Sequence, residues 1–153
     1  MHITEILKKE FIIEDLKARS KRGVLTELSE LFAHGSAQAD TKHMVDVLME
    51  REKLGSTGIG DGIAIPHGKL KGLDTLLLSF GRSREGVDFE SIDGKPVHLF
   101  FLLMAPESST GQHLKALAKI SRMLKDEHFR SELLSASGTE ALFKAITEKD
   151  ETY

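Results

Sequence analysis

Residues 54–70 read Leu-Gly-Ser-Thr-Gly-Ile-Gly-Asp-Gly-Ile-Ala-Ile-Pro-His-Gly-Lys-Leu, and the rest of the chain is interpreted around this stretch. Four glycines fall within eight positions, and a short apolar run then leads to His67, between Pro66 and Gly68. Proline fixes the φ angle before the histidine, and glycine after it removes a side chain that would crowd an incoming group. The pattern predicts a glycine-rich loop, a strand over 63–65 and one histidine presented for reaction.

Two helices are predicted before this stretch, and each begins at a capping residue. Ser20 is the expected N-cap of the first helix and Asp40 that of the second. The first ends near Gly35 and the second at Gly55. Their apolar faces, spaced at about 3.6 residues, comprise Val24, Leu25, Leu28, Leu31 and Phe32, then Met44, Val47 and Leu48. The N-terminus adds a short amphipathic helix with Ile3, Ile6 and Leu7, and a brief strand over 11–13.

Two buried strands are predicted after the stretch, over 75–80 and 97–105, because both segments are short and apolar. Asp93-Gly94 forms the expected turn between these elements. A helix over 112–125 follows. The residues expected to face inward in that helix are Leu114, Leu117, Ala118, Ser121 and Leu124.

A last helix, through Ile146, is predicted from Ser137 and Glu140, which have the spacing of a capping box. Helices and strands alternate along the chain with no internal repeat or linker. We therefore interpret residues 1–153 as a single α/β domain, a mixed β-sheet flanked by helices on both faces as an α/β sandwich.

Composition narrows the classes of function. Apolar residues make up 40% of the chain and charged residues 29%, which is typical of a folded, soluble protein. The net charge of −3, with scattered Lys and Arg, argues against binding to nucleic acid or to an anionic membrane. The absence of cysteine excludes disulfides and thiol chemistry, and the polar N-terminus without a signal-like apolar stretch favours the cytoplasm. No apolar run approaches the ~20 residues of a membrane span.

Glycine-rich nucleotide motifs do not fit the stretch. The glycines between Gly58 and Gly62 lack the Gly-x-Gly-x-x-Gly spacing, and a strand rather than a helix is expected after them. Five residues separate Gly62 from Gly68, one more than a P-loop has, and Leu70 has no hydroxyl for magnesium. A serine hydrolase is disfavoured as well, because the chain contains no Gly-x-Ser-x-Gly elbow.

Metal binding has no local sequence pattern to support it. None of the histidines has a spacing that would place two ligands on one face, although a site assembled from distant residues stays open. The seven histidines are His2, His34, His43, His67, His98, His113 and His128.

The remaining chemistry is that of a nucleophilic histidine. A neutral imidazole near pH 7 carries a lone pair that can attack a phosphoryl group and form a transferable phosphoramidate. Such a site needs a hydrogen bond that fixes the tautomer, N–H donors for the phosphoryl oxygens, and positive charge. His67 is the predicted acceptor. Candidates for the loop that cradles the phosphate are Ser56, Thr57, Gly58, Gly60 and Gly68, with Lys69 as a further cation.

The segment from Arg51 to Lys69 closely resembles the enzyme IIA domain of the bacterial phosphotransferase system. The match is to the fructose/mannitol superfamily and, within it, to the nitrogen-regulatory type. Three further segments carry the resemblance: Phe-Glu-Ser-Ile-Asp-Gly-Lys-Pro-Val at 89–97, Leu-Met-Ala-Pro at 103–106 and His-Leu-Lys-Ala-Leu-Ala-Lys-Ile-Ser-Arg at 113–122. The resemblance implies a mixed-sheet α/β sandwich and a phosphotransferase component that works without a cofactor.

The resemblance also implies roles for three residues. His67 corresponds to the histidine that accepts a phosphoryl group, at Nε2, from a small histidine phosphocarrier protein. His113 corresponds to the second active-site histidine, which stabilises the phosphoryl group. Arg51 corresponds to an arginine that contacts the phosphate or orients the pocket.

Partners follow from the same resemblance. In sugar-transporting branches of the system, a IIB component takes the phosphate, often through a cysteine. This chain has no cysteine, no membrane segment and no room for a fused IIB domain, so a separate IIB or regulatory protein is the expected target. Two alternatives stay open: a stand-alone fructose-type IIA, and a binding module of this fold for which phosphorylation is only a switch or does not occur.

Overall fold

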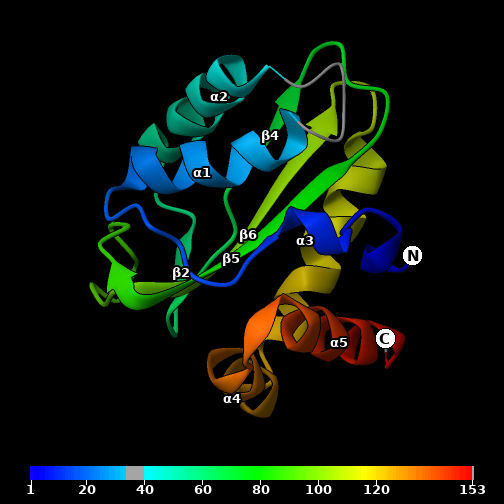
Figure 1. Cartoon of the computed structure of the whole chain (residues 1–153). Helices are drawn as coiled ribbons and strands as arrows, with labels where there is room; N and C mark the ends of the chain where they lie inside the picture. The colour runs from blue at the N-terminus through cyan, green and yellow to red at the C-terminus, as the bar shows by residue number, and fades with distance from the viewer. Residues whose placement is uncertain (34–39, 153) are drawn as a thin grey trace.

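The computed structural model describes residues 1–33 and 40–152, which form a six-stranded mixed sheet between two layers of helices (Figure 1). The predicted fold class, an α/β sheet with helices on both faces, is confirmed. The helices are α1 (Lys21–Ala33), α2 (Thr41–Lys53), α3 (Thr110–Leu124), α4 (Glu127–Ser135) and α5 (Gly138–Glu151), with 3-10 turns η1 (Ile3–Glu5) and η2 (Lys9–Phe11). The strands are β1 (Ile12–Ile13), β2 (Gly58–Gly60), β3 (Ile63–Ala64), β4 (His67–Leu70), β5 (Leu77–Val87) and β6 (Val97–Pro106).

Strands β5 and β6 form the centre of the sheet as a long antiparallel pair. Strand β1 adds in parallel to β5, and β3 and β4 both add in parallel to the other edge of β6. Strand β2 pairs antiparallel with β3. Nearly every residue of β6 is buried, as expected for a strand covered by helices on both faces.

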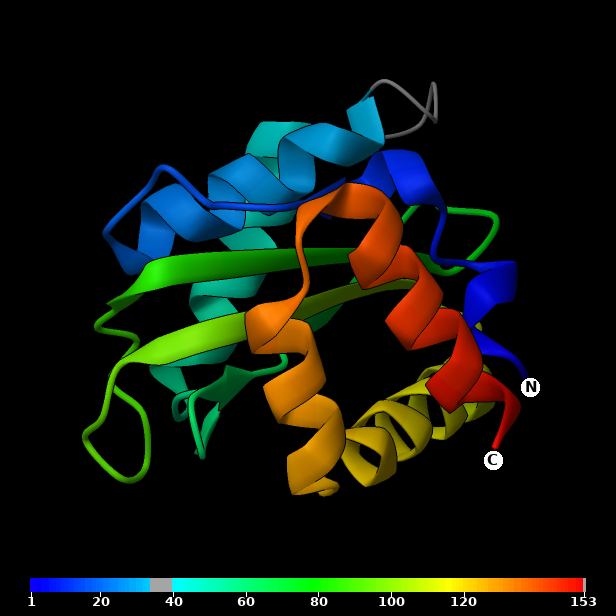
Figure 2. The same cartoon turned by 60° about the horizontal axis from the view of Figure 1, so that its bottom comes forward.

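Helices α1 and α2 cover one face of the sheet, and α3, α4 and α5 cover the other (Figures 1 and 2). The buried apolar side chains of both faces belong to one cluster, in which the rings of Phe80 and Phe101, on the central strand pair, lie 4.9 Å apart. No helix among the described residues is long and apolar enough to cross a membrane.

The first two helices begin at the predicted caps. The hydroxyl of Ser20 accepts a hydrogen bond from the N–H of Gly23 (3.0 Å), and the carboxylate of Asp40 accepts one from His43 (3.3 Å). Each satisfies an N–H group that the first helical turn leaves unpaired. The predicted end of α1 near Gly35 lies outside the described residues. The predicted face of α1 is buried at Val24, Leu25, Leu28 and Phe32 and half-buried at Leu31.

The predicted inward face of α3 is wrong. The side chain of Leu114 is 61% exposed, and Ala118 is exposed as well. The helix turns a different stripe toward the sheet, and that stripe holds polar residues that an apolar pattern does not select. The buried residues of α3 are His113, Ala116, Lys119, Ile120, Met123 and Leu124, so of the predicted set only Leu124 is fully buried.

The predicted capping box at the last helix is also wrong. Ser137 is the N-cap of α5, but its side chain makes no cap hydrogen bond. Glu140 instead pairs with Lys9 of the N-terminal segment, at 2.7 Å. Several elements depart from the predictions in kind. The N-terminal helix is a 3-10 turn, and η2, β2, β4 and α4 were not predicted.

Strand β5 extends past its predicted end, through polar residues up to Val87, because one of these residues has a structural partner. Arg82 is buried and its guanidinium donates to the carbonyls of Leu133 (2.7 Å) and Ala136 (2.6 Å) at the end of α4. A buried arginine that pairs with helix-end carbonyls allows a polar sequence to continue a central strand.

The N-terminal segment is held by a buried carboxylate. Asp150, near the end of α5, accepts hydrogen bonds from the N–H groups of Ile3 (3.0 Å) and Thr4 (3.2 Å) and pairs with Lys119 of α3 (2.6 Å). Burial raises the pKa of Asp150, but the hydrogen bonds from Lys119 and the two backbone N–H groups outweigh burial and lower it. This ion pair therefore joins the two ends of the chain to α3.

Replacing Asp150 by Asn is expected to destabilise the fold by ~3 kcal/mol at pH 7, because it leaves Lys119 buried without its carboxylate. The pKa of Asp150 is lower in the folded protein than in the unfolded chain. Its contribution is therefore complete above about pH 4 and is lost as the pH falls further. Urea unfolding of wild type and variant at pH 7 and pH 3 tests both statements.

Glu148→Gln, an exposed change on the same helix, serves as the control and should shift the free energy of unfolding by less than ~0.5 kcal/mol. An Asp150→Asn protein as stable as this control at pH 7 would contradict the assignment.

Candidate active site

His67 opens the second half of an interrupted strand. Along one edge of β6, β3 pairs as far as Ala64 with Phe100, and β4 then begins with His67 opposite Leu103. Between the two strands, the N–H of Ile65 donates to the carbonyl of Thr57 (3.1 Å), and the carbonyl of Pro66 accepts from the N–H of Leu103 on β6 (2.9 Å). Pro66 has no N–H to contribute to a ladder. The interruption therefore falls directly before the histidine.

The backbone beside this proline provides a partner for the imidazole. Nδ1 of His67 lies 2.8 Å from the carbonyl oxygen of Ile65. A carbonyl can only accept, so Nδ1 carries the proton and the lone pair of the neutral ring is at Nε2. Burial is the largest cause that lowers the pKa of His67. The hydrogen bond to the Ile65 carbonyl raises the pKa, and the charge of Arg51 lowers it further. The ring is therefore neutral at pH 7.

His113 lies against His67 from the first turn of α3. The two rings are in edge-to-face contact, with centroids 5.6 Å apart and planes at 68°. The side chain of His113 is buried, and its Nε2 has no hydrogen-bond partner among the described residues. Burial, followed by the charges of His67 and Lys69, lowers the pKa of His113.

Two cations complete the surroundings of His67. Arg51, in the last turn of α2, donates from Nη1 to the carbonyl of Gly55 (2.9 Å). Lys69 donates from Nζ to the hydroxyl of Thr110 (2.8 Å), which joins β4 to the start of α3.

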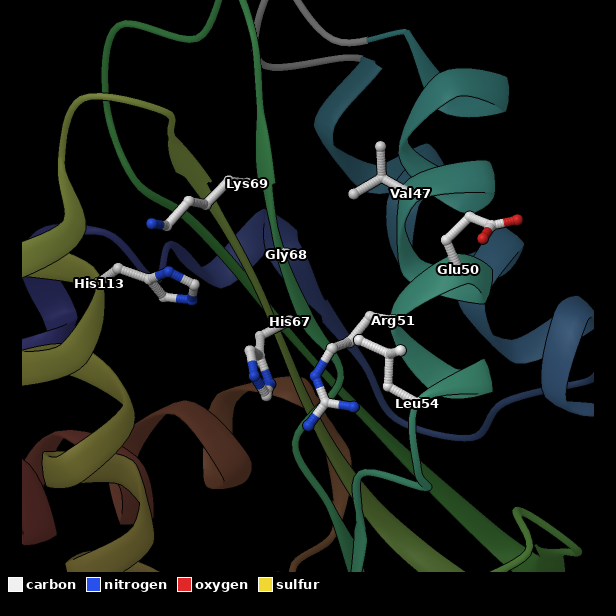
Figure 3. Close-up of a pocket in the computed structure, with 8 residues that line it drawn as sticks. All are labelled: Val47, Glu50, Arg51, Leu54, His67, Gly68, Lys69 and His113. Carbon is white, nitrogen blue, oxygen red and sulfur yellow. The ribbon is translucent and has the colours of Figure 1, made fainter.

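A pocket of about 460 Å³ lies where α2, β4 and α3 meet, and it contains the three residues predicted for the site (Figure 3). His67 points into the space between Arg51 on one side and His113 on the other. The lining residues are Val47, Glu50, Arg51, Leu54, His67, Gly68, Lys69 and His113. Within the ranges 1–33 and 40–152, no group of three or more side chains is arranged to hold a metal ion.

The glycine-rich loop has a structural role in this geometry. The hydroxyl of Ser56 donates to the carbonyl of Phe89 (2.7 Å) and accepts from the N–H of Gly58 (3.0 Å). Ser56, Thr57, Gly58 and Gly60 are not among the residues that line the pocket around His67. Of the predicted phosphate-loop residues, the pocket includes Gly68. The role predicted for the other four at an anion has no support from their position.

Glu52 is a supporting residue that the sequence analysis missed. Its buried carboxylate accepts hydrogen bonds from both the N–H (3.2 Å) and the hydroxyl of Thr57, and it pairs with Lys21 of α1 (3.1 Å). The ammonium of Lys21 also lies 4.8 Å from the ring centre of Phe89. Glu52 follows Leu48 by four residues on the buried face of α2, and this spacing is the signal that could have identified it.

The chain belongs to the family of the phosphoenolpyruvate-dependent sugar phosphotransferase system, EIIA 2, whose model matches residues 5–149. Within that family, the nitrogen regulatory protein of Bradyrhizobium diazoefficiens is 42% identical over 146 residues, 95% of this chain and 95% of that protein. The fructose-specific EIIABC component of Bacillus subtilis is 37% identical over 150 residues, which are 98% of this chain but 24% of that longer protein.

A solved structure leads to the same family. The crystal structure of the nitrogen regulatory protein IIA-Ntr from Neisseria meningitidis matches with a TM-score of 0.88 and 38% identity, over 95% of this chain and 99% of that one. The family inferred from residues 51–69 is confirmed.

Gly68 is required by the contact between β4 and α2. A Cβ at this position would lie 2.9 Å from Cγ1 of Val47. We expect Gly68→Ala to destabilise the fold by ~1–3 kcal/mol, because α2 would have to move away from the strand. Adding Val47→Ala removes the colliding atom and should restore part of the loss, as measured by urea unfolding of the two single variants and the double variant. If the changes in the free energy of unfolding of the two single variants simply add in the double variant, the side chain of Val47 is not what opposes a Cβ at residue 68.

The charge of Arg51 lowers the pKa of His67. Arg51→Gln is therefore expected to raise the pKa of His67 in an NMR pH titration of its ring protons. Lys53→Gln removes a neighbouring exposed cation of the same helix turn and should leave the titration unchanged. A His67 pKa that is equal or lower in the Arg51 variant would contradict the electrostatic contact.

Proposed function

We propose that this protein is a phosphocarrier of the phosphotransferase system, with His67 as the residue that accepts the phosphoryl group. The observation that carries the proposal is the hydrogen bond from Nδ1 of His67 to the Ile65 carbonyl. This bond keeps the proton on Nδ1 and leaves Nε2 as the nucleophile. Membership of the EIIA 2 family supports the same chemistry.

The transfer step exchanges one nitrogen–phosphorus bond for another. The lone pair of Nε2 attacks the phosphorus of a phosphohistidine on a histidine phosphocarrier protein. The new N–P bond forms as the donor's N–P bond breaks, and the donor ring, protonated on its other nitrogen, leaves with that electron pair as a neutral imidazole. Nδ1 of His67 keeps its proton, which it donates in a hydrogen bond to the Ile65 carbonyl throughout. The step therefore requires no base. A phosphoryl group then occupies the pocket.

Positive charge and N–H donors stabilise the transferred group. A phosphoryl group brings a charge of roughly −1.5 to −2, and phosphoryl transfer is catalysed mainly by positioning and electrostatics. Arg51 and Lys69 supply cations on two sides of His67. His113 supplies a ring N–H at short range, and the edge-to-face contact of the two rings supports this role.

The next acceptor is either a regulatory target or a IIB component. Because residues 1–153 contain no cysteine, a phosphocysteine step would take place outside them. The relationship to nitrogen regulatory proteins over almost the full length of both chains favours the regulatory branch. The alternative, a fructose-type IIA that passes phosphate to a IIB component, is favoured by the similarity to a fructose-specific EIIABC component.

A reconstituted relay tests the proposal. Phosphoenolpyruvate, enzyme I and a histidine phosphocarrier protein are mixed with each variant, and intact mass follows the phosphoryl adduct. We expect one acid-labile adduct on wild type and none on His67→Ala. His113→Ala should remain folded but accept phosphate on the order of 10²-fold more slowly, because it lacks one donor to the developing charge. The wild-type rate should fall as the pH decreases through the lowered pKa of His67, because protonation removes the lone pair.

His98→Ala is the matched control. His98 is also half-buried and also bonds a carbonyl through Nδ1, to Ser83 at 2.8 Å, but it lies outside the pocket. This variant should be labelled at the wild-type rate. Labelling of His67→Ala would overturn the assignment of the acceptor. A wild-type protein that takes no phosphate from a relay active on another substrate would instead support a binding module of the same fold.

A further inference from the structure

A second hollow, separate from the pocket of His67, runs along α3 beside the N-terminus. It encloses about 710 Å³ and lies against Met1 and one side of the helix. Figure 2 shows α3 at the rim of the molecule with the N-terminus next to it. Four of the seven lining residues are Lys or Arg, and the side chains of the other three are uncharged. The lining residues are Met1, Lys115, Ala118, Lys119, Ser121, Arg122 and Lys125. We call this hollow the α3 groove.

The cations of the α3 groove form a row. Lys115, Lys119, Arg122 and Lys125 are separated by four, three and three residues, so they share one side of the helix and span ~15 Å along its axis. Such a concentration of positive charge is unexpected in a chain whose net charge is −3. Among the described lining residues, all the charged side chains are positive, which favours an anionic ligand.

One cation of the row is built into the fold. Lys119 is 4% exposed, and its ammonium donates to the carboxylate of Asp150 (2.6 Å) and to the carbonyl of Met1 (2.5 Å). These two contacts fix the wall of the groove and use two of the three N–H donors of Lys119. Lys115, Arg122 and Lys125 are exposed at the surface of the groove. The groove thus has one wall that these contacts hold in place and three charged side chains along its open side.

We propose that the α3 groove binds an acidic segment of a partner protein. A segment of four or five extended residues spans the ~15 Å row and can pair with exposed cations at both of its ends. Among the described residues, the lining contains no aromatic ring on which a nucleobase could stack, which disfavours nucleotides and single-stranded nucleic acid.

Binding of a model acidic segment tests the proposal on the unphosphorylated protein. The probe is a fluorescein-labelled peptide of six Glu-Ser repeats, and six Gln-Ser repeats serve as the neutral comparison. Anisotropy should show binding of the acidic peptide alone at 50 mM salt, with weaker binding at 200 mM salt because the charges are screened. Lys115→Gln, Arg122→Gln and Lys125→Gln combined should weaken binding about tenfold or more, since each exposed charge pair contributes a few-fold.

A second triple variant provides the control for net charge. Lys17→Gln, Lys42→Gln and Lys144→Gln remove three exposed lysines outside the groove, and this variant should bind the acidic peptide within about twofold of wild type. Equal losses of affinity for the acidic peptide in the two triple variants would show that net charge alone attracts the peptide and would overturn the proposal. So would wild-type protein that binds tripolyphosphate but not the acidic peptide, because the groove would then be a site for small polyanions. Either result leaves phosphorylation of His67 untouched.

Discussion

The hydrogen bond between Nδ1 of His67 and the carbonyl of Ile65 is the interaction on which the candidate site depends. Strands β3 and β4 follow the same edge of β6 in register, and Pro66, which has no N–H for the ladder, lies directly before His67. The acceptor for the imidazole is the carbonyl one residue before this proline. The orientation of Nε2 is therefore a property of the backbone.

The surrounding elements act as supports for that imidazole. Helix α2 packs closely on β4, where a Cβ at residue 68 would meet the side chain of Val47, and this packing brings Arg51 to one side of His67. Helix α3 brings His113 to the other side and is joined to β4 through Lys69. The buried Glu52 secures the glycine-rich loop behind the site. The loop thus contributes to the site through the position of the strand that follows it, with its hydroxyls engaged inside the fold.

Local signals in the sequence predicted part of the fold and part of the candidate site. Capping residues and apolar spacing located α1 and α2, and the flanks of His67 identified the central histidine. On α3, Ala116, Ile120, Met123 and Leu124 have the spacing of a buried stripe. The prediction missed this face because His113 and Lys119 lie on it, and the partners that allow their burial lie far away in the chain. The polar end of β5 was missed for the same reason, since Arg82 is paired with carbonyls of α4. Ser56 and Thr57 have the composition of an anion loop, and only the fold shows that their hydroxyls are already bonded.

The tautomer of His67 in the unphosphorylated protein tests the central claim most directly. A long-range ¹H–¹⁵N correlation spectrum of the imidazoles, recorded above the pKa of His67, distinguishes a protonated ring nitrogen from one with a free lone pair. The account predicts that Nδ1 of His67 carries the proton and that Nε2 has the chemical shift of an unprotonated nitrogen. A proton on Nε2 would contradict it, because the Ile65 carbonyl would then not be the acceptor and the nucleophilic lone pair would point away from the pocket.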